Sequence, residues 1–391
     1  MHDASSEQTS RTSAAAPVDS ASLASLLRPA LAEALARALG REVSEIAFFR
    51  TEWQRGGAAT GRVRLRAGGG PADECIVKLP VHDAELRWYR RLGRGNDPTH
   101  ADPVRGDHSR ETDARDVPSR DIASRDIASR DIASHDTASR EAHAPVVARL
   151  YASGEELGGF DLAWIAVERI PHGPPLRAIT AEDLAALVDA GARFALAASR
   201  FAIDREVRCE PWREHVARAL DTARARQLDH HQVWLGLLKQ VTRDLDALAS
   251  LWQSRETDGW IHGDLHPGNG LRHAPDMGSP VTLIDLANVR PGHWLEDAVY
   301  LERLLWTRPA LLASARPVRR MADARRALGL GLGPDWDRLA RVRRVLLAAT
   351  APAFLRSEGS PAFLAACIGQ LEENLRQLGA LRAPTKALES L

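Results

Sequence analysis

The polar side chains most able to do chemistry gather in one short segment of the C-terminal half. It reads Trp260-Ile261-His262-Gly263-Asp264-Leu265-His266-Pro267-Gly268-Asn269. Pro267 and Gly268 do not continue a helix or a strand, so we expect the polar groups to sit on a fixed loop. A second carboxylate, Asp285, lies sixteen residues beyond Asn269, directly behind the apolar pair Leu283-Ile284.

This set of side chains matches what phosphoryl transfer from ATP requires. One carboxylate accepts the proton of the attacking hydroxyl, while an amide oxygen and a second carboxylate supply hard oxygen ligands to Mg²⁺. Such a site also needs a cation on the phosphates. Lys78 is the candidate, because the chain has only three lysines among its 52 basic residues and this one ends an apolar strand. Glu85 follows seven residues later, at the start of a helix predicted over 84–92, where it could hold the ammonium group.

The elements around Lys78 are predicted strands. Three apolar runs are separated by glycine-rich turns and predict an antiparallel meander, at 46–53, 61–67 and 74–79. A further strand-like run at 162–170 ends in Pro171-His172-Gly173-Pro174-Pro175, which is typical of a hinge.

The remainder of the chain is predicted to be mostly helical. Thr180 with Asp183 has the pattern of a capping box that opens a helix. Apolar periodicity predicts helices over 23–39, 180–202, 212–228, 231–254, 295–306, 335–350 and 361–381, with short strands at 260–262 and 281–286. The predicted fold class is α+β and bilobal, with a small antiparallel sheet in the N-lobe and a larger, mostly helical C-lobe.

Composition shifts suggest where the parts of the chain begin and end. We expect a disordered tail over 1–20, the N-lobe over 21–170, and the C-lobe over 171–391 with the catalytic loop at 260–290. Residues 94–143 form a low-complexity insertion in which Ser-Arg-Asp-Ile-Ala repeats from Ser119. Five-residue steps spread the isoleucines around a helix, so a solvated, weakly helical insertion is expected. A partner-binding arm is the alternative.

Composition also excludes several classes of partner. The chain has 52 basic and 52 acidic residues, so no net field favours nucleic acid or an anionic membrane surface. Its three cysteines are scattered, which argues against a disulfide framework or a thiolate zinc site and favours a reducing cytoplasm. We expect neither a signal peptide nor a membrane span, because no long apolar stretch is present.

The motifs together resemble a known family. The segment 262–269, followed by Leu283-Ile284-Asp285, resembles the catalytic loop and metal-binding strand of the aminoglycoside phosphotransferase and choline kinase-like family, a branch of the protein-kinase-like fold. Val77-Lys78, the helix at 85–92 and the hinge at 168–173 follow the family's order, so the likeness spans about 45 to 310.

The resemblance implies a role for each matching residue. Asp264 would be the catalytic base, Asn269 and Asp285 the Mg²⁺ ligands, and Lys78 the phosphate-binding lysine paired with Glu85. The nucleotide would be ATP, with its adenine held by backbone groups of Glu168 to Ile170. The segment 54–61, with Gly56 and Gly57, would cover the phosphates. Asp297, in Glu296-Asp297-Ala298-Val299-Tyr300-Leu301, would brace the catalytic loop. The implied activity is phosphorylation of a small-molecule hydroxyl.

Several alternatives stay open at this point. His262, Asp264 and His266 could instead bind zinc in a hydrolase. A nucleotide-binding pseudokinase that serves as a scaffold is a second alternative. The acceptor could be an aminoglycoside, an amino alcohol or a sugar-like molecule. A cationic acceptor would favour an acidic pocket, to which Glu296, Asp297 and Glu302 could contribute.

Overall fold

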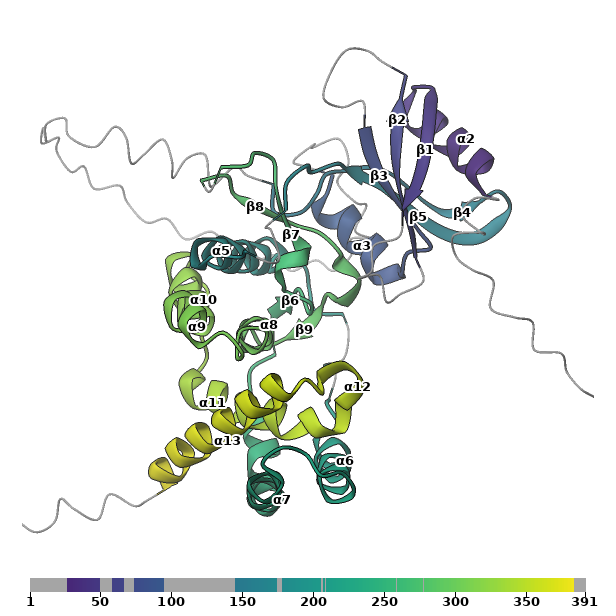
Figure 1. Ribbon diagram of the computed structural model, residues 1–391. Helices are drawn as coiled ribbons and strands as arrows, with labels where there is room; N and C mark the ends of the chain where they lie inside the picture. The colour runs from purple at the N-terminus through teal and green to yellow at the C-terminus, as the bar shows by residue number, and fades with distance from the viewer. Residues whose placement is uncertain are drawn as a thin grey trace, which may run out of the picture. The chain divides into compact units, whose positions relative to one another are not determined.

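The computed structural model describes nine stretches of the 391-residue chain. They are residues 27–49, 58–66, 74–94, 145–173, 178–204, 207, 209–257, 259–276 and 278–382. The predicted tail, the pentad insertion from residue 95 onward, and Gly56 with Gly57 lie outside these stretches. Contacts divide the chain into two compact units (Figure 1). The first comprises residues up to Leu86 together with Leu150–Arg169, and the second comprises Arg87–Arg149 together with Ile170–Leu391.

The first unit is built on a five-stranded antiparallel sheet in the order β1-β2-β3-β5-β4. Its strands are β1 (Val43–Phe49), β2 (Ala59–Leu65), β3 (Glu74–Leu79), β4 (Leu150–Leu157) and β5 (Phe160–Glu168). The register pairs Val63 with Cys75 and Val77 with Ala166, so buried residues of neighbouring strands face the same core. The predicted meander of the first three strands is confirmed.

Helix α2 (Arg28–Leu39) closes the core of this unit by packing on the sheet. Leu31 and Leu35 are one helical turn apart and fully buried among Val63, Cys75 and Trp164. The helix ends at Gly40, which has φ 63° and adopts the left-handed conformation common after a helix C-terminus. The end of the helix predicted over 23–39 is therefore confirmed.

The edges of the sheet differ from the sequence-based prediction. Strand β1 begins at Val43, earlier than the predicted 46, because its polar residues Ser44 and Glu45 are tolerated on an outer strand. Strand β4 was not predicted, since Ser153, Gly154 and two glutamates interrupt its apolar alternation. Helix α3 (Asp83–Leu92) matches the prediction to within one residue, and the division between the units falls inside it.

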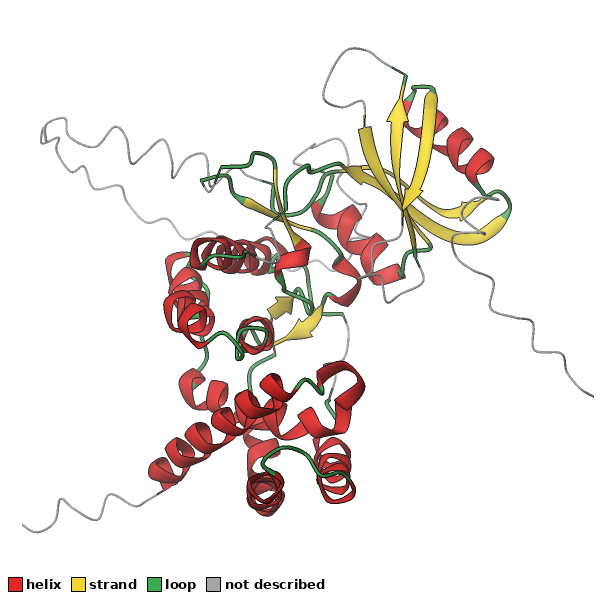
Figure 2. Ribbon diagram, in the orientation of Figure 1, coloured by secondary structure: helices red, strands yellow, loops and turns green. Residues whose placement is uncertain are grey.

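Helices predominate in the second unit (Figure 2). They are α5 (Ala181–Ala198), α6 (Trp212–Ala225), α7 (His231–Gln253), α8 (Leu295–Arg303), α9 (Pro309–Ala315), α10 (Pro317–Ala327), α11 (Trp336–Thr350), α12 (Leu355–Glu358) and α13 (Pro361–Arg382). Helix α11 is the centre of the packing, because it contacts α6, α7, α8 and α13. Helices α9 and α10 were not predicted, and each is short and begins at a proline.

Two small antiparallel ribbons position the polar loop of this unit. Strand β6 (Gly259–Ile261) pairs with β9 (Arg290–Gly292), and β7 (Gly270–Arg272) pairs with β8 (Val281–Leu283). The 3₁₀ turn η3 (Pro267–Asn269) precedes β7, and η4 (Leu286–Asn288) follows β8. The segment 262–269 therefore connects the two ribbons. It is a loop, as predicted from Pro267 and Gly268.

The start of α5 anchors the β7–β8 ribbon. Thr180 and Asp183 form the predicted capping box, with the Asp183 amide donating to the Thr180 hydroxyl at 3.2 Å. Asp183 Oδ2 accepts a hydrogen bond from the backbone N–H of Thr180 at 3.1 Å, and Oδ1 accepts one from Arg272 on β7 at 2.7 Å. The side chains of Asp183 and Arg272 are both buried. One carboxylate thus caps a helix and fixes the strand that leaves the polar loop. Among the described residues, no helix has the length and apolarity needed to cross a membrane.

Candidate active site

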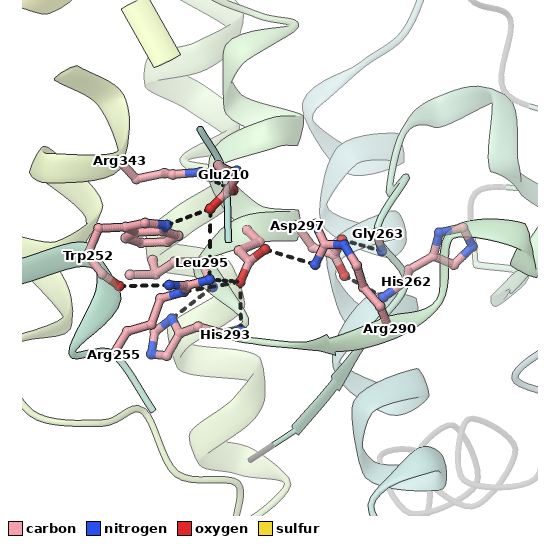
Figure 3. Close-up of polar contacts among 11 residues, drawn as sticks. Glu210, Trp252, Arg255, His262, Gly263, Arg290, His293, Leu295, Asp297 and Arg343 are labelled. Atoms are coloured by element: carbon pink, nitrogen blue, oxygen red, sulfur yellow. Dashed lines mark hydrogen bonds and ion pairs between the residues drawn. The ribbon is translucent and has the colours of Figure 1, made fainter. Parts of the chain in front are cut away.

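The loop after β6 is held by a carboxylate from helix α8. Asp297 Oδ2 accepts a hydrogen bond from the backbone N–H of His262 at 2.8 Å, and Oδ1 accepts one from that of Gly263 at 2.8 Å (Figure 3). Burial raises the pKa of Asp297, although His262 and the two backbone hydrogen bonds oppose that rise. The bracing contact expected at Asp297 is present in the structure.

Only glycine fits at position 263. Its φ is 78°, and a Cβ placed there would lie 2.2 Å from the carbonyl oxygen of Asn288. The neighbouring His262 is fully buried, with Nε2 3.0 Å from the carbonyl oxygen of Ile284. The loop is therefore pressed against the segment that leads from β8 into η4.

The carboxylate of Asp264 is surrounded by hydrogen-bond donors. Tyr300 donates its hydroxyl to Oδ1 at 3.0 Å, and the amide of Asn269 donates to Oδ2 at 3.3 Å. His266 Nε2 lies 3.6 Å from Oδ2, while its Nδ1 accepts from the backbone of Gly268. Burial would raise the pKa of Asp264, but hydrogen bonds from His266 and Tyr300 outweigh it and keep the pKa below the usual value. The carboxylate is thus ionised at neutral pH, as a proton acceptor must be.

Asn269 and Asp285 are brought together by the β7–β8 ribbon. The backbone N–H of Ile284, the residue before Asp285, donates to the carbonyl of Asn269 at 3.0 Å. Asp285 itself adopts φ 60°, in the left-handed region, and its N–H donates to the hydroxyl of Tyr89 at 3.3 Å. This turn of the backbone at Asp285 is unusual for a residue other than glycine.

The chemistry of these two side chains fits a magnesium ion. The amide nitrogen of Asn269 donates to the backbone carbonyl of Asp264 at 2.9 Å, which leaves its amide oxygen as the coordinating atom. With the carboxylate of Asp285 this gives two hard oxygen ligands, the type that Mg²⁺ prefers. The residues present are therefore suited to hold the metal that the sequence implied.

In the first unit, Lys78 and Glu85 form the predicted pair. Lys78 Nζ lies 2.9 Å from Glu85 Oε1, and the Glu85 residue is only 1% exposed. The interval of seven residues suffices because β3 ends one residue after Lys78 and α3 begins at Asp83. The buried carboxylate thus fixes the ammonium group at the end of the strand.

The predicted adenine-binding segment is partly a strand. Glu168 is the last residue of β5 and pairs with Cys75, whereas Ile170 is buried just beyond the strand. Their role in binding a nucleotide remains a prediction, as does that of Gly56 and Gly57, which the described ranges do not include.

The acids of α8, which the sequence named only as possible contributors to an acidic acceptor pocket, are engaged within the protein. Glu296 accepts hydrogen bonds from Arg255 at 3.1 Å and from Arg290 at 2.8 Å. Glu302 is buried and paired with Arg344 at 2.6 Å. Asp297 is occupied by the loop backbone. The sequence alone left this possibility open, because partners of these acids lie 35 to 42 residues away along the chain.

A larger buried network continues from Glu296. Arg255 donates to the carbonyl of Trp252 at 2.8 Å, and the indole of Trp252 donates to Glu210 at 3.2 Å. Glu210 also pairs with Arg343 of α11. Burial would raise the pKa of Glu296, but the nearby arginines keep it lowered. The network thus joins α7, α8 and α11, which carry Trp252, Glu296 and Arg343.

The zinc alternative finds no support in this geometry. The ring of His262 is directed to the carbonyl of Ile284. Within the stretches that the structure describes, no three His, Cys, Asp or Glu side chains lie together as ligands of one metal ion.

The profile of the Phosphotransferase enzyme family matches residues 136–342, slightly more than half of the chain. The chain belongs to this family. The match includes the segments that carry Asp264, Asn269, Asp285 and Asp297, and it confirms both the family resemblance and the kinase-like fold class. It begins after Lys78 and Glu85, so it does not cover that pair. No curated protein matches the sequence.

Solved structures of other phosphotransferases are similar at low identity. The aminoglycoside phosphotransferase from Alicyclobacillus acidocaldarius is 17% identical with a TM-score of 0.46, over 86% of this chain and 92% of that one. A microcompartment-associated aminopropanol kinase is 14% identical with a TM-score of 0.49, over 89% and 97%. The macrolide 2'-phosphotransferase from Brachybacterium faecium is 13% identical with a TM-score of 0.39, over 88% and 97%.

Two tyrosines of this phosphotransferase were missed by the sequence analysis. Tyr300 lies three residues after Asp297 in the predicted helix at 295–306, so the two share a helix face, and that spacing was a usable signal. Tyr89, which contacts the backbone of Asp285, gave no signal, because its partner lies 196 residues away.

Replacement of Gly263 tests the fit of the loop. Gly263→Ala should lower the thermal midpoint strongly, because the new Cβ meets the carbonyl of Asn288. Gly329→Ala is a matched control, since Gly329 has φ 71° but no atom within 4 Å of the added Cβ. The control should lose only about 1–2 kcal/mol of unfolding free energy, which is the cost of a Cβ in the left-handed conformation. Equal shifts of the midpoint in the two variants would contradict the packing argument.

Acid should destabilise the second unit through His293. Burial, with Arg325 and Arg255 nearby, lowers the pKa of His293 to about 4, although Glu296 opposes this. Below pH 6.5 the unfolded chain therefore binds a proton that the folded chain does not, and stability falls as the pH is lowered from about 6.5 towards about 4. Between pH 7 and 5 the loss from this group is about 2 kcal/mol.

His293→Asn removes this titration while keeping an acceptor for the backbone N–H of Leu295. The thermal midpoint of the variant should fall less than that of the wild type between pH 7 and pH 5. The exposed His82→Asn serves as the reference for the loss of a histidine. If His293→Asn keeps the pH dependence of the wild type, His293 is not the group that makes the protein less stable in acid.

Proposed function

We propose that this phosphotransferase transfers the γ-phosphoryl group of ATP, with Mg²⁺, to a hydroxyl of a small molecule. The observation that carries the proposal is the double contact of Asn269. Its side-chain amide nitrogen donates hydrogen bonds to Asp264, and its backbone carbonyl accepts one from Ile284, the residue before Asp285. Asn269, itself a candidate metal ligand, thereby links the candidate base to the segment that carries the other ligand, Asp285.

In the proposed reaction, Asp264 takes the proton of the acceptor hydroxyl as that oxygen forms a bond to the γ-phosphorus. The bond from the γ-phosphorus to the bridging oxygen breaks, and ADP leaves. The magnesium ion, when bound, offsets negative charge on the phosphate oxygens. The protein's contribution is to position the groups and to stabilise charge, with Asp285 and Asn269 presenting their oxygens from a fixed ribbon.

The first unit would contribute to nucleotide binding. Lys78 would contact phosphate oxygens, and Glu85 would keep its ammonium group oriented. Backbone groups from Glu168 to Ile170 would bind the adenine, and Gly56 and Gly57 would lie over the phosphates. For the acceptor, an aminoglycoside, an amino alcohol and a sugar-like molecule all offer the required hydroxyl.

Calorimetric titration tests the metal assignment. ATP should bind wild-type protein more tightly with Mg²⁺ than without, and Asp285→Ala should lose that difference. The matched control is Asp276→Ala, an exposed carboxylate in the same β7–β8 hairpin, which should behave as wild type. An Asp285→Ala protein that retains the full magnesium effect would remove Asp285 from the site.

Turnover tests the base. Asp264→Asn should bind MgATP as the wild type does but release ADP about 10²–10⁴-fold more slowly with a panel of hydroxyl acceptors. Unchanged turnover would eliminate Asp264 as the base. A wild type that binds MgATP and never releases ADP would instead identify the chain as a pseudokinase scaffold.

A further inference from the structure

Helix α8 contacts the catalytic loop at two points on one face. Asp297 holds the backbone at His262 and Gly263, and Tyr300, three residues later, reaches the side chain of Asp264. Residues three apart on a helix are neighbours on its surface. The same rigid element therefore fixes both the path of the loop and the carboxylate at its centre.

The two oxygens of Asp264 are held unequally. Oδ1 receives the Tyr300 hydroxyl at 3.0 Å, the shortest contact to this carboxylate from another side chain. Oδ2 has longer contacts, at 3.3 Å to Asn269 and 3.6 Å to His266. A carboxylate with one oxygen fixed in this way does not rotate freely about its Cβ–Cγ bond. Oδ2 then keeps the weaker contacts and can accept a further proton donor.

We propose that Tyr300 is a positioning residue for phosphoryl transfer. Its hydroxyl fixes the plane of the Asp264 carboxylate so that Oδ2 is directed at the acceptor hydroxyl. This inference rests on the proposed function, because it assigns the proton of the acceptor to Asp264. It predicts an effect on the chemical step and not on nucleotide binding, since the hydroxyl of Tyr300 contacts the carboxylate of Asp264.

Packing alone does not account for the hydroxyl of Tyr300. The neighbours of Tyr300 on α8, Val299 and Leu301, are fully buried apolar residues, whereas Tyr300 is half-buried with its hydroxyl on Asp264. A phenylalanine would fill the same volume without the donor. The exchange of tyrosine for phenylalanine therefore isolates the hydrogen bond.

The experiment compares Tyr300→Phe with Tyr151→Phe, a tyrosine on β4 of the first unit. The probe is MgATP with the same panel of hydroxyl acceptors, an aminoglycoside, an amino alcohol and a sugar, measured by ADP release, together with the thermal midpoint of each protein. Tyr300→Phe should lower kcat about tenfold or more, with KM for MgATP and the midpoint unchanged. Tyr151→Phe should keep the wild-type kcat and KM for MgATP.

A third variant separates positioning from loop stability. Asp297→Asn weakens the brace of the loop and should lower the thermal midpoint and kcat together. If Tyr300→Phe follows that pattern, or keeps the wild-type kcat while Asp264→Asn is inactive, the Tyr300 proposal is overturned and the proposed function stands. If wild-type protein releases no ADP, or Asp264→Asn keeps full activity, the proposed reaction fails and the role of Tyr300 fails with it.

Discussion

The rest of the site depends on the hydrogen bonds between the buried carboxylate of Asp297 and the backbone of the catalytic loop. The carboxylate accepts two backbone hydrogen bonds from consecutive residues of the catalytic loop. A buried charge of this kind is tolerable only while its partners are present, because an unpaired one carries a large desolvation cost. The loop can therefore take only the path in which His262 and Gly263 face α8. That path places Asp264 beside Tyr300 and Asn269.

Helix α8 is itself fixed by charge on its other side. Glu296 precedes Asp297 in sequence but is bonded to Arg255 and Arg290, away from the loop backbone. Buried ion pairs of this type add little net stability, but the removal of one partner leaves an uncompensated charge and is strongly destabilising. Their effect here is to set the position of α8. The acids of this helix are consequently structural, and an acceptor must be recognised by other groups.

The sequence was informative where the interaction is local. Asp264, Asn269 and Asp285 were proposed because loop-breaking residues and a short strand surround them. The pair Thr180 and Asp183 was predicted correctly because a capping box spans only four residues. The Lys78–Glu85 pair was predicted because Lys78 lies at the end of a strand and Glu85 at the start of the helix that follows it.

Interactions between distant segments could not be predicted in the same way. Arg255 and Glu296 are 41 residues apart, and nothing in either segment specifies the other. The three-residue strands β7 and β9 are too short to show a period of two. Strand β4 lies at an edge and lacks alternation. A single sequence therefore supplied the candidate residues of the site and the helix that carries Asp297, but not the ion pairs that fix that helix.

The most direct test is a crystal structure with a non-hydrolysable ATP analogue and Mn²⁺ in place of Mg²⁺, with the metal located by its anomalous scattering. The account predicts a manganese peak about 2.1 Å from the amide oxygen of Asn269 and from a carboxylate oxygen of Asp285. Asp264 should face the γ-phosphoryl group without binding the metal. A metal held by Asp264 or away from Asn269 and Asp285, with nucleotide bound, would contradict the account.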